Sequence, residues 1–232
     1  MKRIAIIPAR GGSKRIPRKN IKDFLGKPVI AYTIQAALET PLFDEVMVST
    51  DDEEIAEVAR QYGAETPFLR SAKNADDFAS TVDVLSEVLK SYRLRGYEFN
   101  EGCCIYATAP FITVEKLKAA HSLFREGEFD TVFTATRFSY PIQRALRLKK
   151  GGRVEMFWPE NQSKRSQDLE PAYHDAGQFY WFRPEVLAGE KQLFTSKSAI
   201  LEVPQAEVQD IDEPEDWGLA EMKYQVLNKI QP

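Results

Sequence analysis

The amino-acid sequence predicts an α/β protein with a Rossmann-like, doubly wound and mostly parallel sheet. Two observations lead to this fold class. Short apolar runs typical of strands alternate with amphipathic segments typical of helices, and the alternation repeats from residue 3 to residue 137. The first run, residues 3–8, is continuously apolar and β-branched, as in a strand that is buried on both faces. Ligands of such sheets bind at the carboxyl ends of the strands.

The elements that follow the first strand are assigned from periodicity and capping residues. Pro28 is acceptable in the first turn of a helix, Gly63 closes another helix, and Ser80 or Thr81 caps a third. Helices are predicted at residues 28–39, 51–63, 80–93 and 113–127, strands at 44–50, 102–110 and 130–137, and a short strand or loop at 65–70. The sheet is expected to resume at 177–182 and 199–204. An amphipathic helix over 213–230 carries Trp217, Leu219, Met222, Val226 and Ile230.

The alternation breaks between residues 138 and 169, where the sequence becomes polar and rich in turn-forming residues. Two short alternating stretches, 144–150 and 153–158, flank a pair of glycines and predict a β-hairpin. Phe157 and Trp158 beside this hairpin favour packing against another surface, and a homodimer contact is the default expectation. We therefore expect one domain, 1–232, with an inserted dimerisation hairpin at about 138–169.

Composition excludes several classes of protein. The chain has 232 residues, of which 43% are hydrophobic and 28% charged, unlike disordered or membrane chains. Its net charge of -4 argues against holding nucleic acid by bulk charge. Cys103 and Cys104 are neighbours in a predicted strand, which disfavours a disulfide between them, and no zinc-binding spacing is present. The apolar run 4–9 is too short for a signal peptide or a membrane span, so a cytoplasmic protein is expected.

Positive charge is concentrated in the loop after the first strand, residues 8–20. Between residues 2 and 27 there are nine lysines and arginines against the single acid Asp23. Gly11 and Gly12 let backbone N–H groups approach an anion, and Ser13 adds a hydroxyl donor. The pattern is neither a P-loop nor a dinucleotide fingerprint. It predicts a cradle for a triphosphate; the alternative is a flexible basic surface loop, or one that touches nucleic acid.

A pair of aspartates near the C-terminus is the second candidate site. Asp210 and Asp212 share one face of an extended segment, with Ile211 facing the core. Mg²⁺ prefers few protein carboxylates and completes its shell with water and phosphate oxygens, which suits this pair beside a triphosphate loop. The alternative is that these acids cap the last helix, which fits the stretch from Asp212 to Asp216.

The basic loop and the DxD pair together resemble the cytidylyltransferases that activate nine-carbon acidic sugars, the CMP-sialic acid synthetase or acylneuraminate family. The similarity covers essentially the whole chain and implies a fold of the nucleotide-diphospho-sugar transferase type. The CTP-binding residues that it implies are Arg10, Gly11, Gly12, Ser13, Lys14, Lys19, Asn20, Arg70 and Ser80. It also implies catalytic roles for Arg10, Lys14, Lys19, Asp210 and Asp212, with Mg²⁺ held by the two aspartates. Ser80 fits a simple helix N-cap equally well.

The expected sugar site departs from the sialic acid enzymes in two places. The stretch 173–182, YHDAGQFYWF, resembles the pseudaminic acid cytidylyltransferases, and residues 106–112 lack the glutamine and arginine of the sialic acid pattern. The sugar-binding residues expected are Tyr106, Thr108, Arg165, Gln167, Tyr173, His174, Asp175 and Gln178. The expected reaction transfers CMP from CTP to a nonulosonic acid, pseudaminic acid first, with pyrophosphate as the second product. A CMP-sialic acid or other CMP-ulosonate synthetase, and a non-enzymatic nucleotide- or nucleic-acid-binding module, are the alternatives.

Overall fold

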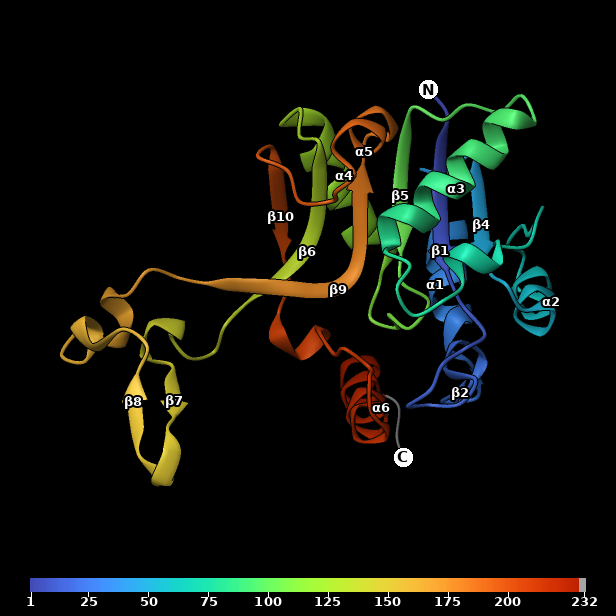
Figure 1. Cartoon of the computed structure of the whole chain (residues 1–232). Helices are drawn as coiled ribbons and strands as arrows, with labels where there is room; N and C mark the ends of the chain where they lie inside the picture. The colour runs from blue at the N-terminus through green and yellow to red at the C-terminus, as the bar shows by residue number, and fades with distance from the viewer. Residues whose placement is uncertain (230–232) are drawn as a thin grey trace.

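A six-stranded sheet forms the centre of the computed structural model, which describes residues 1–229 (Figure 1). Its strands are β1 (Arg3–Pro8), β4 (Glu45–Ser49), β5 (Glu101–Ile105), β6 (Thr131–Arg137), β9 (Tyr173–Phe182) and β10 (Ser198–Glu202). Their spatial order is β10-β6-β9-β5-β1-β4. β9 runs antiparallel to β5 and β6, whereas the other neighbouring strands pair in parallel. The mostly parallel sheet predicted from the sequence is confirmed.

Helices cover both faces of this sheet. They are α1 (Val29–Leu38), α2 (Glu53–Gln61), α3 (Thr81–Leu94), α4 (Val114–Glu126) and α5 (Pro184–Glu190). Helix α6 (Pro214–Asn228) lies apart from the two faces. Ala5 and Ile7 of β1 belong to a core with side chains of α1, α2 and α4. Ile4 and Ile6 belong to a second core with side chains of α3 and α5. This division follows because successive side chains of a strand point to opposite faces, and it confirms the doubly wound arrangement.

Gly102 in β5 has no room for a side chain, because a Cβ there would lie 2.2 Å from Cζ of Phe182 on β9. We therefore expect Gly102→Ala to lower the free energy of unfolding by about 1–3 kcal/mol, the usual cost of overpacking a core. The matched control is Gly218→Ala in α6, where a Cβ would meet nothing within 4 Å. It should stabilise the protein by up to about 1 kcal/mol, since alanine favours helix over glycine. Urea denaturation measures both, and an unchanged midpoint for Gly102→Ala would contradict the prediction.

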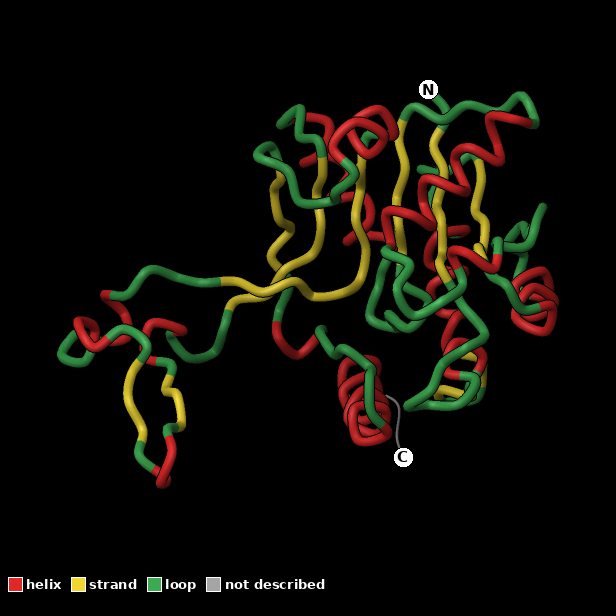
Figure 2. The backbone as a smooth tube through the Cα atoms, viewed as in Figure 1, coloured by secondary structure: helices red, strands yellow, loops and turns green. Residues whose placement is uncertain are grey.

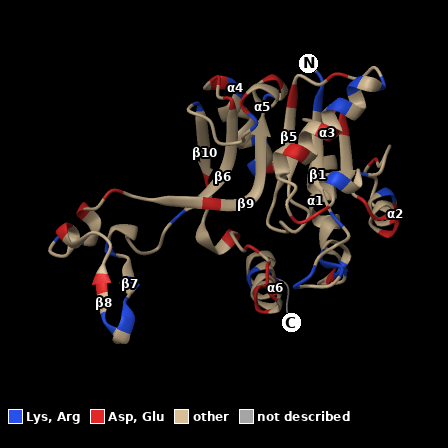
Figure 3. Ribbon diagram, viewed as in Figure 1, with Lys and Arg blue, Asp and Glu red and all other residues tan. Residues whose placement is uncertain are grey.

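The insertion leaves the main sheet on an arm formed by the first residues of β9 (Figures 1 and 2). A register shift between Phe133 and Ala135 of β6 separates this arm from the rest of the β6–β9 pairing. At its end, β7 (Leu146–Leu148) pairs antiparallel with β8 (Val154–Met156), which confirms the predicted hairpin. Figure 3 shows lysine and arginine at the hairpin tip. Short 3-10 helices surround it at Ile142–Arg144, Lys150–Gly152, Pro159–Asn161 and Ser166–Asp168.

The hairpin exposes several apolar side chains. Leu146, Leu148 and Val154 share one face by the strand register, and Leu148 is 77% exposed. Phe157 and Trp158, which follow β8, are also exposed. The dimerisation role of the insertion stays a prediction.

The last helix differs from its predicted pattern. α6 buries Trp217 and Ala220, whereas Leu219, Met222 and Val226 are exposed, so the predicted apolar face is wrong. The physical reason is that α6 lies beyond the carboxyl ends of the strands rather than against a face of the sheet (Figure 1), so few of its side chains are buried. Ile230, the last residue of the predicted face, lies outside the described residues. Helix α5, which follows β9 directly, was not predicted.

A small third core fastens α6 to the rest of the chain. It joins Ile16 of the basic loop, Ile211 between the two aspartates, and Trp217 of α6. Two short strands, β2 (Asp23–Phe24) and β3 (Lys27–Pro28), pair beside it and bury Phe24. Apolar contacts therefore hold the two motifs singled out in the sequence close together. Within the described chain no helix combines the length and the apolar character needed to cross a membrane.

Candidate active site

The basic loop starts at the carboxyl end of β1 and is held by hydrogen bonds to its own backbone and to the segment after β4. Gly11 N–H donates to Oδ1 of Asp51 at 3.0 Å, and Asn20 Nδ2 donates to the carbonyl of Arg10 at 2.9 Å. Arg18 binds Asp52, which lowers the pKa of that carboxyl to about 2. A Cβ on Gly11 would lie 2.9 Å from Cβ of Asp52, so glycine is required for this close approach. The loop is thus an ordered structure.

The cations of the loop face a cleft of about 530 Å³ at the carboxyl ends of β1 and β5, here called the first cleft. The predicted site residues that line it are Arg10, Ser13, Lys14, Lys19, Asn20, Arg70, Tyr106, Thr108 and Asp212. Arg10 and Lys14 both pair with the carboxylate of Asp77, Arg10 at 2.8 Å. These ion pairs are exposed, so a more highly charged anion can displace them at small cost. Gly11 and Gly12 belong to the loop but do not line the cleft.

Arg70 and Ser80 have different places in the structure. Arg70 is 8% exposed and its guanidinium donates from Nε to Oγ of Ser49 at 3.1 Å. Burial lowers the pKa of Arg70. Ser80 is the N-cap of α3 and forms a capping box with Asp83, so the N-cap alternative is the role that the structure shows. The next residue, Thr81, lines the first cleft and lies 3.3 Å from the hydroxyl of Tyr106.

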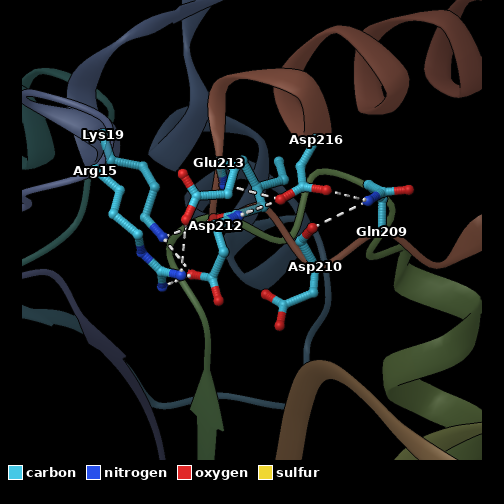
Figure 4. A network of polar contacts seen from close by, with 8 residues as sticks. Arg15, Lys19, Gln209, Asp210, Asp212, Glu213 and Asp216 are labelled. Atoms are coloured by element: carbon cyan, nitrogen blue, oxygen red, sulfur yellow. Dashed lines mark hydrogen bonds and ion pairs between the residues drawn. The ribbon is translucent and has the colours of Figure 1, made fainter. Parts of the chain in front are cut away.

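The DxD segment lies opposite the basic loop. Ile211 is fully buried, as predicted, and the carboxylates of Asp210 and Asp212 point to the same side of the chain (Figure 4). Arg15 pairs with Oδ1 of Asp212 at 2.7 Å, and Lys19 Nζ donates to the carbonyl of Ile211 at 2.6 Å. The acids that follow serve the helix: Glu213 and Asp216 form the capping box of α6. The cap and the candidate metal pair are therefore different residues.

The two aspartates repel each other. Desolvation by the surrounding protein, followed by the negative charge of Asp212, raises the pKa of Asp210. Both cations near Asp212, Arg15 and Lys19, approach its Oδ1. No cluster of three or more histidine, cysteine or acidic side chains with metal-binding geometry occurs among residues 1–229. A cation at this pair would therefore need further ligands from a substrate or from water.

A second cleft of about 490 Å³ adjoins the first. Tyr106 lines both clefts, and Asp210 lines the second while Asp212 lines the first. His174 and Asp175 of the predicted sugar site also line the second cleft, together with Ala176, Gly177, Tyr180, Gln205, Val208, Gln209 and Lys223. The DxD segment stands where the two clefts meet.

The polar groups of β9 are fixed within the second cleft. Nδ1 of His174 lies 2.9 Å from the carbonyl of Asp175, and its ring packs against Phe138 at 4.8 Å. The Asp175 carboxylate accepts from the N–H of Gly177 at 2.8 Å and from the hydroxyl of Tyr180. Burial raises the pKa of Tyr180, which stays a donor. The side chain of Asp175 is thus oriented by two donors.

Four predicted sugar residues lie elsewhere in this chain. Arg165 pairs with Asp168 within the insertion at 2.7 Å, and Gln167 lines a separate cleft at the base of the insertion. Tyr173 lies on the exposed arm of β9. Gln178 is buried, with Nε2 donating to the carbonyl of Glu207 at 2.6 Å. Arg165, Gln167 and Tyr173 do not gather with His174 because the arm carries the insertion away from the sheet, whereas the Gln178 side chain is engaged in the protein interior. The sugar-binding role of all four stays a prediction.

Comparison with known proteins identifies the family of the chain. The family model described as "Cytidylyltransferase" matches residues 4–199. The chain belongs to the cytidylyltransferase family. A pseudaminic acid cytidylyltransferase of Campylobacter jejuni is 46% identical to this cytidylyltransferase over 226 residues, 97% of each chain.

More distant relatives share the same length or the same fold. A CMP-N,N'-diacetyllegionaminic acid synthase of Legionella pneumophila is 33% identical over 99% of this cytidylyltransferase and 98% of the relative. The solved structure of CMP:2-keto-3-deoxy-manno-octonic acid synthetase complexed with CTP has a TM-score of 0.69 at 19% identity, covering 99% of this chain and 100% of that one. This last likeness shows the fold, and it confirms the predicted fold class.

Proposed function

We propose that the protein transfers CMP from CTP to the anomeric hydroxyl of a nonulosonic acid, pseudaminic acid, and releases pyrophosphate. The observation that carries the proposal is the junction of the two clefts. Asp212 lines the cleft with the loop cations, Asp210 lines the neighbouring cleft, and Tyr106 lines both. A nucleotide in the first cleft and an acceptor in the second would therefore meet beside the DxD segment.

The residues of the first cleft suit a phosphoryl transfer. The reaction is a displacement at the α-phosphorus by the C2 hydroxyl of the sugar, with pyrophosphate leaving in line. Positioning and electrostatic stabilisation provide most of the catalysis in such reactions. Arg10, Lys14 and Lys19 supply positive charge for the leaving pyrophosphate, and Ser13 adds a hydroxyl donor. Arg70, which is buried in the lining of the same cleft, would contact the base or the ribose of the nucleotide.

The DxD pair fits Mg²⁺. Two carboxylates on one side of the chain, one with a raised pKa beside the other, favour a bound cation. Mg²⁺ takes few protein ligands and keeps water or phosphate oxygens, which agrees with a pair rather than a full protein cage. When bound, the ion neutralises phosphate charge and acidifies an attacking hydroxyl. Arg15 and Lys19 hold Asp212 in place from its Oδ1 side.

Pseudaminic acid is favoured over other nonulosonic acids by the relatives' names and by the residues of the second cleft. The 46% identical relative is named for pseudaminic acid, whereas the legionaminic acid synthase is 33% identical. In the second cleft, His174 and Asp175 belong to the stretch that departs from the sialic acid pattern. We assign the reaction to the cytoplasm, where CTP is available.

A homodimer formed through the insertion is part of the proposal. The exposed apolar side chains of the hairpin support it, because apolar side chains gathered on an exposed surface mark interaction sites. Light scattering of the purified protein measures its mass in solution. A monomer at micromolar concentration would contradict the dimer.

A pyrophosphate-release assay tests the reaction and the substrate together. CTP is compared with ATP, GTP and UTP, and pseudaminic acid with legionaminic acid, sialic acid and an eight-carbon ulosonate, with and without Mg²⁺. We expect release only with CTP and Mg²⁺, fastest with pseudaminic acid. Absence of release with every acid, together with salt-dependent oligonucleotide binding, would instead support a binding module.

His174 provides a prediction on sugar choice. His174→Ala removes a ring that packs on Phe138 and lines the second cleft but not the first. We expect the KM for pseudaminic acid to rise about tenfold or more, the value of one good polar contact, while the Kd for CTP stays unchanged. Steady-state kinetics and calorimetry measure the two constants. The KM values for legionaminic and sialic acid are measured alongside, and an unchanged ranking of the sugar acids would contradict the assignment.

A further inference from the structure

The second cleft contains a cation that the proposed reaction does not yet use. A nonulosonic acid carries a carboxylate on C1, next to the anomeric C2 whose hydroxyl attacks. The acids Asp175 and Asp210 line this cleft and would repel that carboxylate. Within the described residues, Lys223 is the one lysine or arginine that lines it. An anionic substrate in this cleft therefore meets a single fixed positive charge.

Lys223 is held in position by two acceptors from the chain just before the DxD pair. It extends from α6, and its Nζ donates to the carbonyl of Val208 at 2.8 Å and to Oε1 of Gln209 at 3.0 Å. An ammonium group has three N–H donors, so one remains for a ligand. The side chain is partly buried, and burial lowers its pKa. Because the side chain is partly buried and its ammonium group is hydrogen-bonded, the positive charge is preorganised to bind an anion.

We propose that Lys223 binds the C1 carboxylate of the sugar acid and makes the second cleft selective for anionic sugars. The proposal rests on the function proposed above. The lysine is anchored to Val208 and Gln209, the residues immediately before Asp210. A carboxylate paired with Lys223 would therefore place the neighbouring C2 hydroxyl beside the junction of the clefts. Lys223 thus selects the acceptor and orients it for attack.

A purely structural role for Lys223 makes a different prediction. In that case the lysine only ties α6 to residues 208–209, and its loss would displace the DxD segment and lower kcat with every substrate. Lys223→Gln separates the two roles, because the amide keeps N–H donors while the charge is lost. Lys223→Arg keeps the charge. The matched control is Lys229→Gln. It removes an exposed lysine at the end of the same helix, and Lys229 lines neither cleft.

The experiment measures KM for pseudaminic acid, kcat and the Kd for CTP in these variants. For Lys223→Gln we expect KM to rise about ten- to a hundredfold, the loss of one charge-assisted hydrogen bond, with the Kd for CTP unchanged. Lys223→Arg should recover part of this loss, and Lys229→Gln should match the wild type. With the C1 carboxamide of pseudaminic acid, wild type and Lys223→Gln should have the same KM.

Two results would overturn the proposal: an unchanged KM in Lys223→Gln, whether or not kcat falls, or the same fold-loss for the carboxamide as for the acid. The wild-type measurement tests the proposed function independently of Lys223. If the wild type releases no pyrophosphate with CTP and any sugar acid, the reaction is wrong. If it does and Lys223→Gln behaves as the wild type, only the role of Lys223 is wrong.

Discussion

Replacing Asp210 by asparagine is expected to lower kcat by a factor of a hundred or more and to leave the fold intact. The change removes a negative charge from the junction of the clefts, where the proposed Mg²⁺ binds, but it keeps the volume of the side chain. Loss of one electrostatic group at a reacting centre costs about 10²–10³ in rate. The measurement is Mg²⁺-dependent pyrophosphate release, with urea denaturation to confirm that stability is retained.

Glu215→Gln is the control for Asp210→Asn. Glu215 is an exposed acid in the first turn of α6, so its substitution removes the same charge a short distance away along the chain. We expect it to affect stability by less than about 1 kcal/mol through the helix dipole and to leave kcat unchanged. Near-normal turnover in Asp210→Asn, or an equal loss in both variants, would count against the metal site.

Arg10→Ala is expected to lower kcat/KM for CTP by about a hundredfold or more. Arg10 lines the first cleft from the end of β1, and its guanidinium donates to exposed acceptors of residues 76 and 77. Arginine forms strong bidentate hydrogen bonds with phosphate, so its removal weakens nucleotide binding and leaving-group stabilisation together. Steady-state kinetics with varied CTP at saturating sugar acid measure the effect.

Lys22→Ala tests whether the loss in Arg10→Ala comes from contact or from net charge. Lys22 belongs to the same basic stretch, but its Nζ lies over the ring of Trp217, 4.4 Å from the ring centroid, and does not line the cleft. Its substitution should change CTP kinetics less than twofold. Unchanged CTP kinetics in Arg10→Ala would contradict the phosphate assignment. Equal losses in the two variants would mean that Arg10 acts through the net charge of the loop rather than through contact with the phosphates.

Local sequence patterns predicted the elements that are buried on both sides or capped by strong signals. The apolar run of β1 and the capping box of α3 follow from residues that are adjacent in the sequence. The exposed face of α6 was mispredicted because periodicity shows which residues share a helix face but not whether another layer covers it. Helix α5 is only seven residues long and gives too few turns for a periodic signal.

The sequence predicts only part of the candidate site, because local patterns do not show which distant residues come together. For motif residues such as Arg10 and Asp212, residue type and spacing predict a chemical role, and both residues line the first cleft. Thr81 and Lys223 carry no such signal, because their importance depends on contacts across long stretches of chain. Asp77 likewise follows no motif, although it pairs with two loop cations. Only the three-dimensional structure shows that these residues lie at the two clefts.

The small core of Ile16, Ile211 and Trp217 has a consequence for the time at which the enzyme becomes active. Ribosomal synthesis releases the basic loop first and the DxD segment nearly two hundred residues later. Ile16 can pack against Ile211 and Trp217 only after these two residues have emerged. A nascent chain would therefore carry the proposed phosphate-binding half of the site without the half that would complete it. We expect catalysis to begin only after the last helix has docked.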